Sequence, residues 1–315
     1  MISLRYHIVS IAAVFLALAV GVVLGSTALN GTLLSGLSDE KSELANRVTD
    51  LEAERNTLNA RLADADAFAG SVGGKVVDGL LDKRSVILVT TEGAKPADRD
   101  AIKELVGQAG ASVTGEVQLT SSFADPGKAD QLREVATRLQ PAGAQFPTAG
   151  DPGTLAGALL GSVLMLDKDS ADRQSAPTEL TAALSGLADG GFIKPPEDVA
   201  PAQLAVVLTG GKASGDGAGD RAATLARFAT QLDRAGAGTV LAGDPASAEG
   251  TGAVGVARAD TASTSIMSTV DNVGSSAGRV ATLLALREQL EGNAGRYGVA
   301  GNAEAPAPGV EQEGR

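Results

Sequence analysis

The side chains that most often catalyse reactions or bind metals are scarce in this sequence. The chain has no cysteine and a single histidine, His7, beside a long apolar segment. This histidine cannot activate a serine or threonine nucleophile in the rest of the chain. Met165 and Met267 are the only methionines after Met1, too few for a soft-metal site of sulfur and imidazole ligands. We therefore expect no catalytic residue, no cofactor and no resident metal.

Three aspartates form a second group of residues that could do chemistry. Asp244, Asp260 and Asp271 follow predicted strands in the C-terminal part of the chain. If they meet at the carboxyl edge of a parallel sheet, a pair of them could act as general acid and base. Aspartate is also common in turns and helix caps, which explains all three residues more simply. An acid–base site and purely structural roles both stay open.

The loop at residues 210–220 (GGKASGDGAGD) lies between a predicted strand and a predicted helix. In α/β folds this is a position at which phosphates bind. The loop, however, matches neither the GxxxxGK[ST] nor the GxGxxG pattern, and Asp216 and Asp220 oppose an anion. We predict a flexible surface loop with an aspartate cap, and a ligand site is the alternative.

Length and charge limit the kinds of protein that this chain can be. It has 315 residues, a formal net charge of −12 and 43% hydrophobic residues. The length suffices for a membrane anchor, a stalk and one sizeable globular domain or two small ones. An acidic surface repels phosphate backbones, so nucleic acid is not an expected partner.

An apolar segment near the start must position everything that follows. Residues 8–29 (IVSIAAVFLALAVGVVLGSTAL) contain no charge and no proline, and about 20 apolar residues suffice to cross a bilayer. Arg5 precedes the segment, and the first charges after it are Asp39 and Glu40. The positive-inside bias therefore places residues 1–7 in the cytoplasm and the C-terminal domain outside the cell membrane, as a single-pass protein held in the lipid bilayer. A cleaved signal peptide is the alternative.

Two consecutive patterns predict a parallel homodimer. Small residues recur at every fourth position of the apolar segment, which lets two membrane helices pack closely. Residues 34–69 then follow a heptad pattern typical of a coiled coil. Both patterns need a parallel partner on the same axis. The predicted dimer interface comprises Ala17, Gly21, Gly25, Leu37, Leu44, Val48, Leu51, Leu58 and Leu62.

Charges beside the heptad seam agree with this dimer. Arg47 would face Glu52 of the second chain, and Arg61 would face Asp66. Each exposed pair contributes less than about 1 kcal/mol, so the pairs set register more than strength. Because some seam positions are basic, a single amphipathic helix folded back on the globular domain stays open as an alternative.

Residues 75–297 alternate between β-branched apolar runs and helical segments, which is typical of a parallel sheet with helices on both faces. Glycines at residues 70–74 are predicted to end the stalk helix. We predict an extracytoplasmic α/β domain with a mostly parallel, doubly wound sheet and a helical insertion, with two separate halves as the alternative. Residues 298–315 are predicted to be a disordered tail. Strands are expected at residues 85–90, 112–119, 191–194, 205–209, 239–242 and 253–258.

Several segments of the sequence carry a likeness to a known family. They are MISLRYHIVSIAAVFLALAVGVVLGS at the start, VGQAGASVT, VVLTGG, GTVLAG and STVDNVGSSAGRVATLLAL. Over nearly the whole chain the sequence resembles the MctB family, actinobacterial proteins called copper transporters or outer-membrane copper transport proteins. Related corynebacterial members, named SteB, act in daughter-cell separation with a membrane partner, SteA.

The resemblance implies two functions and no catalytic residues. One is a non-enzymatic, dimeric scaffold or regulator of the cell envelope, which acts in cell separation with a SteA-like partner in or below the membrane. The other is copper efflux or copper homeostasis, as the family name implies. A single-pass anchor with a dimeric stalk favours the scaffold. Copper would be involved only indirectly, because the chain lacks the ligands of a copper carrier.

Overall fold

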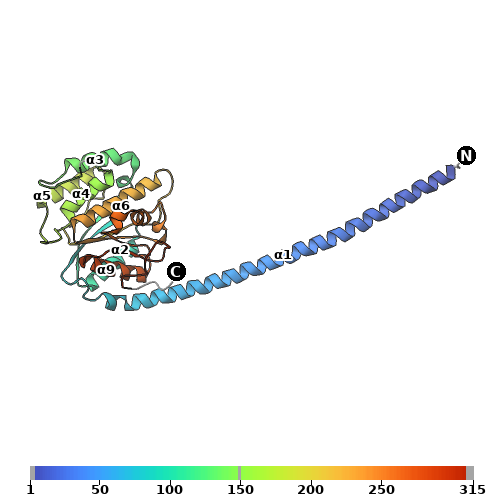
Figure 1. Ribbon diagram of the computed structural model, residues 1–315, viewed down its shortest axis with the longest axis horizontal. Coiled ribbons are helices and arrows are strands. Elements are labelled where there is room, and N and C mark those ends of the chain that lie inside the picture. Colours follow the sequence, from blue (N-terminus) through green and yellow to red (C-terminus); the bar gives the residue numbers. More distant parts are fainter. Residues whose placement is uncertain (1–3, 148–149, 310–315) are drawn as a thin grey trace. The chain divides into compact units, whose positions relative to one another are not determined.

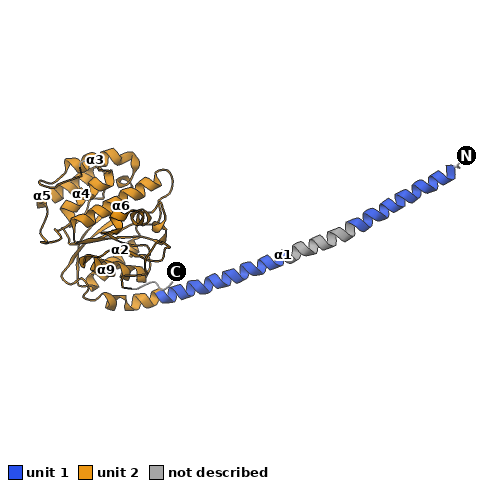
Figure 2. Cartoon of the chain, in the orientation of Figure 1, with its two compact units in different colours: residues 1–65 blue, residues 66–315 orange. Residues whose placement is uncertain are grey.

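The computed structural model describes residues 4–147 and 150–309, apart from the side chains of residues 26–39, which lie outside the description. The chain divides into two compact units, Met1–Ala65 and Asp66–Arg315 (Figure 2). The described part of the first unit consists of helix only, and all of the strands belong to the second unit.

Helix α1 (Leu4–Val77) continues through the glycines that were expected to end it. The predicted break at residues 70–74 is therefore wrong. A Cβ atom at Gly73 would lie 2.8 Å from Cγ2 of Val280 in helix α9 (Ser276–Leu290). The glycines thus allow the last turns of α1 to pack closely on the domain, and this packing offsets the roughly 1 kcal/mol that each glycine costs in a helix.

The second unit is built on a six-stranded sheet whose strand order is β2-β1-β3-β4-β5-β6. Every neighbouring pair of strands is parallel, so the predicted parallel α/β sheet is confirmed. The chain leaves β1 toward β2 on one side and later returns to place β3 on the other side. The strands are β1 (Ser85–Thr91), β2 (Ser112–Leu119), β3 (Leu204–Leu208), β4 (Gly238–Ala242), β5 (Ser268–Val270) and β6 (Arg296–Tyr297).

The two faces of the sheet bury two separate apolar clusters, because successive side chains of a strand point to opposite faces. Ile87 and Val89 of β1 pack into a cluster with helices α3 to α7, whereas Val86 and Leu88 pack with α2 and α9. Figure 1 shows these helices on the two sides of the sheet. The remaining helices are α2 (Pro96–Gln108), α3 (Ala129–Arg138), α4 (Pro152–Leu164), α5 (Pro177–Asp189), α6 (Ala218–Ala235), α7 (Ala253–Ala259) and α8 (Thr261–Thr264).

Helices α4 and α6 approach each other closely because α4 carries glycine at every fourth position. A Cβ atom at Gly153 would lie 2.2 Å from the carbonyl oxygen of Thr224. At Gly157 it would lie 2.8 Å from the carbonyl oxygen of Phe228, and Gly161 likewise faces α6. Side chains at these positions would force the helices apart, so the glycines set the distance between them.

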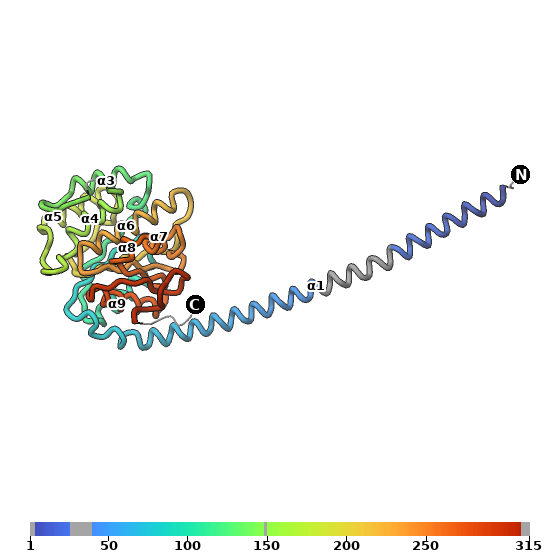
Figure 3. The backbone as a smooth tube through the Cα atoms, in the orientation of Figure 1, coloured from blue at the N-terminus to red at the C-terminus, as the bar shows by residue number. Residues whose placement is uncertain are grey.

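Two predicted strands are absent from the described residues. Residues 253–258 form α7, in which Val254 and Ala257 are both buried at a helical spacing of three. Their small and β-branched residues suggested a strand, but contacts with α6 favour the helix (Figure 3). At residues 191–194 the described chain makes only a single bridge, between Ile193 and β2, and no strand.

The C-terminal segment is bound to the domain over part of the length that was predicted to be disordered. The N–H groups of Val299 and Ala300 donate to Oδ1 of Asp271 at 2.7 and 3.2 Å. The described part of this segment reaches Gly309, while residues 310–315 lie outside the described residues. The prediction of disorder is therefore wrong for the part bound here, because hydrogen bonds to a buried carboxylate hold a segment that has little apolar surface.

Candidate functional site

The predicted dimer face of α1 is open in the single chain. The five heptad residues Leu44, Val48, Leu51, Leu58 and Leu62 are between 47% and 68% exposed. A Cβ atom at either of the predicted interface glycines of the apolar segment would meet no described atom within 4 Å. Ala17 is also exposed, and Leu37 lies outside the residues whose side chains are described.

The same helix contains a segment that could cross a membrane. Among the described residues, Leu4–Gly25 is the one helical stretch long and apolar enough to do so, with 22 residues and a mean hydropathy of 2.8. At 1.5 Å per residue it would rise about 33 Å, close to the thickness of a hydrocarbon core. This stretch covers most of the apolar segment that was predicted at residues 8–29.

The charges beside the seam have partners within their own chain. Arg47 pairs with Glu43 one turn earlier, at 2.5 Å. The Asp66 carboxylate accepts the backbone N–H of Ser276 at 2.5 Å. The predicted pair between Arg61 and Asp66 of a second chain stays a prediction, and in the single chain Asp66 already has Ser276 as a partner. Asp66 lies at the N-terminus of α9, where a carboxylate satisfies a free N–H group and interacts favourably with the helix dipole.

The three candidate aspartates have separate partners. The Asp260 carboxylate is the N-cap of α8 and accepts the N–H of Ala262 at 3.1 Å. Asp244 lies 3.0 Å from the Nζ atom of Lys95, and this hydrogen bond raises the pKa of Lys95. Asp271 binds a different cation. The interpretation of these residues as caps and ion-pair partners therefore explains their positions.

The partner of Asp271 is the buried Arg258, and together they join β5, β6 and the C-terminal segment. Nη1 of Arg258 lies 2.7 Å from Oδ2 of Asp271, and both side chains are almost fully buried. The guanidinium also donates to Oγ1 of Thr269, to the carbonyl oxygen of Tyr297 and to Oδ1 of Asn302. Burial lowers the pKa of Arg258, and the hydrogen bond that Arg258 donates to Asp271 opposes this shift.

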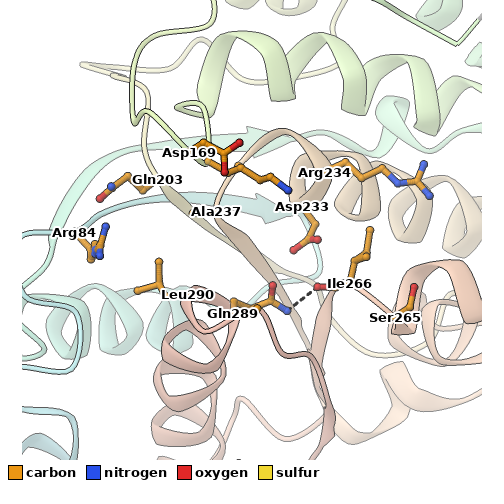
Figure 4. A pocket seen from close by; sticks show the side chains of 13 residues that line it. Arg84, Asp169, Gln203, Asp233, Arg234, Ala237, Ser265, Ile266, Gln289 and Leu290 are labelled. Carbon is orange, nitrogen blue, oxygen red and sulfur yellow. Dashed lines mark hydrogen bonds between the residues drawn. The ribbon is translucent and has the colours of Figure 1, made fainter.

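A cavity of about 570 Å³ lies at the amino edge of the sheet, where strands begin (Figure 4). Asp233, at the end of α6, is buried in its wall and accepts the N–H of Thr239 at 2.7 Å. Burial raises the pKa of Asp233 to about 7, although that hydrogen bond and the charges of Arg234 and Lys168 oppose the shift. Sequence reasoning missed this residue. The available signal was an acidic residue in the last helical turn, where the dipole disfavours it.

A second cavity, of about 250 Å³, lies at the carboxyl edge. It is lined by the residues that follow β1, β2 and β3 and by the first turns of α6, and it includes the start of the predicted loop at 210–220. The N-cap of α6 is Gly217, with a φ of 71°, and not an aspartate as predicted. Asp216 and Asp220 are exposed and do not line this cavity.

The metal-binding residue types are not gathered in the part of the chain that the structure describes. No group of three or more His, Cys, Asp and Glu side chains that could hold a metal ion occurs there. Met165 and Met267 are buried in the apolar cluster around α4 and α6. Their sulfur atoms lie in packed core, so they offer no open thioether site.

Comparison with known proteins places the chain in a family. A family model described as "Copper transport outer membrane protein, MctB" matches residues 1–308. Proteins named "Copper transporter MctB" from Mycobacterium tuberculosis and Mycobacterium bovis are 41% identical over 303 residues, which cover 95% of this chain and 96% of theirs. A protein of the same name from Mycobacterium leprae is 42% identical over 307 residues, with the same coverage. The family match includes the apolar segment, the heptad region and the α/β domain, and the chain therefore belongs to the MctB family.

Proposed function

We propose that the chain is a membrane-anchored, dimeric component of copper transport, which acts as a non-enzymatic scaffold in the cell envelope. One observation carries this proposal: α1 combines an apolar segment long enough to span a membrane with a row of exposed apolar residues at heptad positions. Exposed apolar surface of this kind is typical of membrane and protein contacts. A parallel coiled coil of two chains covers the row without rearranging the α/β domain.

The involvement of copper rests on the names of the relatives, which are called copper transporters. In this chain copper lacks its preferred soft ligands, because there is no cysteine and the two internal methionines are buried. We therefore propose that the metal passes through a larger assembly that this chain anchors or positions. The separate structural partners of Asp244, Asp260 and Asp271 support a non-enzymatic role.

The proposed topology is a single membrane crossing with a short cytoplasmic N-terminus and an extracytoplasmic α/β domain. It is supported by Arg5 before the apolar segment and by the acidic residues that follow it. A partner protein in the membrane or at its cytoplasmic side would contact the apolar helix or the residues that precede it.

A strain that lacks the gene tests this function when copper content and cell separation are scored side by side. We expect the deletion strain to accumulate copper and to grow poorly at raised copper concentration, with normal septa. The wild-type gene should reverse both effects. Normal copper content would contradict the proposal.

The same experiment distinguishes the envelope role in cell separation, which the sequence alone favoured. Chained, unseparated cells with unchanged copper content would support that role and a SteA-like partner. The names of the relatives point to copper transport and do not mention cell separation.

A further inference from the structure

The carboxyl edge of the sheet contains a crevice whose position is typical of ligand sites. The chain runs from β1 to β2 in one direction, and β3 and β4 extend the sheet in the other direction. The helices that follow β1 and β3, which are α2 and α6, therefore pack on opposite faces of the sheet. In open parallel sheets, ligands bind in the crevice outside the carboxyl ends of the strands, at this reversal of strand order.

The crevice is a cavity of about 250 Å³, and its apolar lining residues are together called the apolar wall. Leu119 at the end of β2 and Leu225 of α6 form this wall, together with alanines of α6 and α7. Hydroxyl groups of Thr91, Ser121 and Thr209 also line it. A ligand that fits this cavity is small, and part of its surface is less polar so that it can contact the apolar wall.

Two glycines bring the loops after β1 and β3 into backbone contact beside this cavity. A Cβ atom at Gly210 would lie 2.5 Å from the carbonyl oxygen of Gly93. Within the described residues, no hydrogen bond uses the backbone N–H groups of Gly210 and Gly211. Consecutive amide groups at the end of a strand can form a concave site for an anion.

Two cationic side chains also line the cavity. The Nζ atom of Lys212 lies 2.7 Å from Oε2 of Glu249, and both side chains are about half exposed. Exposed pairs of this kind contribute little, so Lys212 can exchange this partner for a bound anion. Arg221 donates to the carbonyl oxygens of Ser214 and Asp216 at 2.5 and 2.8 Å and thereby holds the loop.

The acidic residues of the loop do not oppose an anion in this cavity. Asp216 and Asp220 are exposed and contribute no lining atoms. Glu92 is the one carboxylate among the described lining residues, against the two cations Lys212 and Arg221. The lining residues alone therefore carry more positive than negative charge, and Glu249, which lies outside the lining, balances Lys212 until an anion replaces it.

We propose that this crevice binds a small phosphate monoester. The phosphate would accept hydrogen bonds from the N–H groups of Gly210 and Gly211 and pair with the ammonium group of Lys212. The less polar side of the esterified body would lie against Leu119 and Leu225. This binding site goes beyond the proposed function in copper transport and does not depend on it.

Titration of the full-length protein in detergent micelles tests the proposal, with ribose 5-phosphate, ribose and inorganic phosphate as probes. Isothermal titration calorimetry should detect saturable binding of ribose 5-phosphate, with at least tenfold weaker binding of inorganic phosphate and none of ribose. Absence of saturable binding of either phosphate would overturn the proposal. Equal binding of both phosphates would overturn the role of the apolar wall.

Variants of one lysine locate the site. Lys212→Glu should weaken ribose 5-phosphate binding at least tenfold, whereas Lys212→Arg should keep it within about threefold. Lys75→Glu makes the same charge change on the exposed surface of α1 and should have no effect. If Lys212→Glu and Lys75→Glu weaken binding equally, the binding is general electrostatic attraction and the crevice is not the site.

Discussion

At the scale of single residues, two buried aspartates show opposite solutions to the same problem. Burial of a carboxylate without a cation is costly, so buried acids either pair or keep their proton. Asp271 pairs with Arg258 at 2.7 Å. Asp233 has the Thr239 N–H as its close partner, and its pKa rises to about 7. Asp271 therefore stabilises one arrangement of the C-terminal segment, whereas Asp233 makes the fold sensitive to pH.

Replacing Asp233 should raise stability at alkaline pH. In the unfolded chain this carboxyl ionises near 3.8, but in the folded protein near 7, so folding disfavours the ionised form. As pH rises, the carboxyl group loses its proton first in the unfolded state, so the stability of the fold falls between the two pKa values. Above pH 7 the full loss of stability persists. We expect Asp233→Asn to be about 1–3 kcal/mol more stable than wild type at pH 8 and equal at pH 4.

Pulse proteolysis in urea, on the full chain in detergent micelles, measures this difference. Asp169→Asn is the matched control, because Asp169 lines the same cavity but is exposed. Its stability should follow that of the wild type at both pH values. Parallel pH curves for Asp233→Asn and the wild type would contradict the assignment of a buried, proton-retaining carboxyl group.

At the scale of elements, the sequence predicted a helix or strand well when that element was long and its residue pattern was regular. β1 and β2 were predicted within one residue, β1 from its continuous β-branched run and β2 from its alternating pattern. β5 and β6 have three and two residues, too few for an alternating pattern. The end of α1 was mispredicted because glycine can either end a helix or allow close packing. Which role applies depends on neighbours distant in sequence, such as Val280 opposite Gly73.

The candidate sites show the same limit. The loop at residues 210–220 was recognised because its composition and its place after a strand are local features. Whether Asp216 and Asp220 repel an anion in the cavity depends on which way the folded loop turns their side chains, and this could not be predicted. The one local signal of Asp233 was its place in the last turn of α6, and its burial could not be predicted because it depends on the strand that packs beside it.

The glycine spacing of α4 leads to a prediction at this scale. A methyl group at Gly157 would lie 2.7 Å from Cβ of Gln231 and 2.8 Å from the carbonyl oxygen of Phe228. Gly157→Ala should therefore destabilise the domain by about 2 kcal/mol, because forced separation of α4 and α6 outweighs the better helix propensity of alanine. The measurement is again urea titration with pulse proteolysis.

Gly107→Ala supplies the control, since Gly107 also lies inside a helix, α2, but a Cβ atom there would meet nothing within 4 Å. Only the difference in helix propensity then applies, and this variant should have a free energy of unfolding up to about 1 kcal/mol higher than that of the wild type. If both variants are stabilised, close packing does not set the distance between α4 and α6.

At the scale of the whole molecule, the proposed function requires two chains, and the absence of native cysteine permits a direct test. In a parallel coiled coil, seam residues of the two chains lie opposite each other, whereas residues on the outer face do not. Single-cysteine variants Leu51→Cys and Ala53→Cys place a thiol on the seam and on the outer face of the same turn. In native membranes treated with a mild oxidant, Leu51→Cys should form a disulfide-linked dimer, and Ala53→Cys should stay largely monomeric. Disulfide linkage at neither position, or equal linkage at both, would mean that the exposed row of α1 does not pair with a second copy. The dimeric scaffold would then have to be abandoned, even if copper accumulation in the deletion strain upheld the role in copper transport.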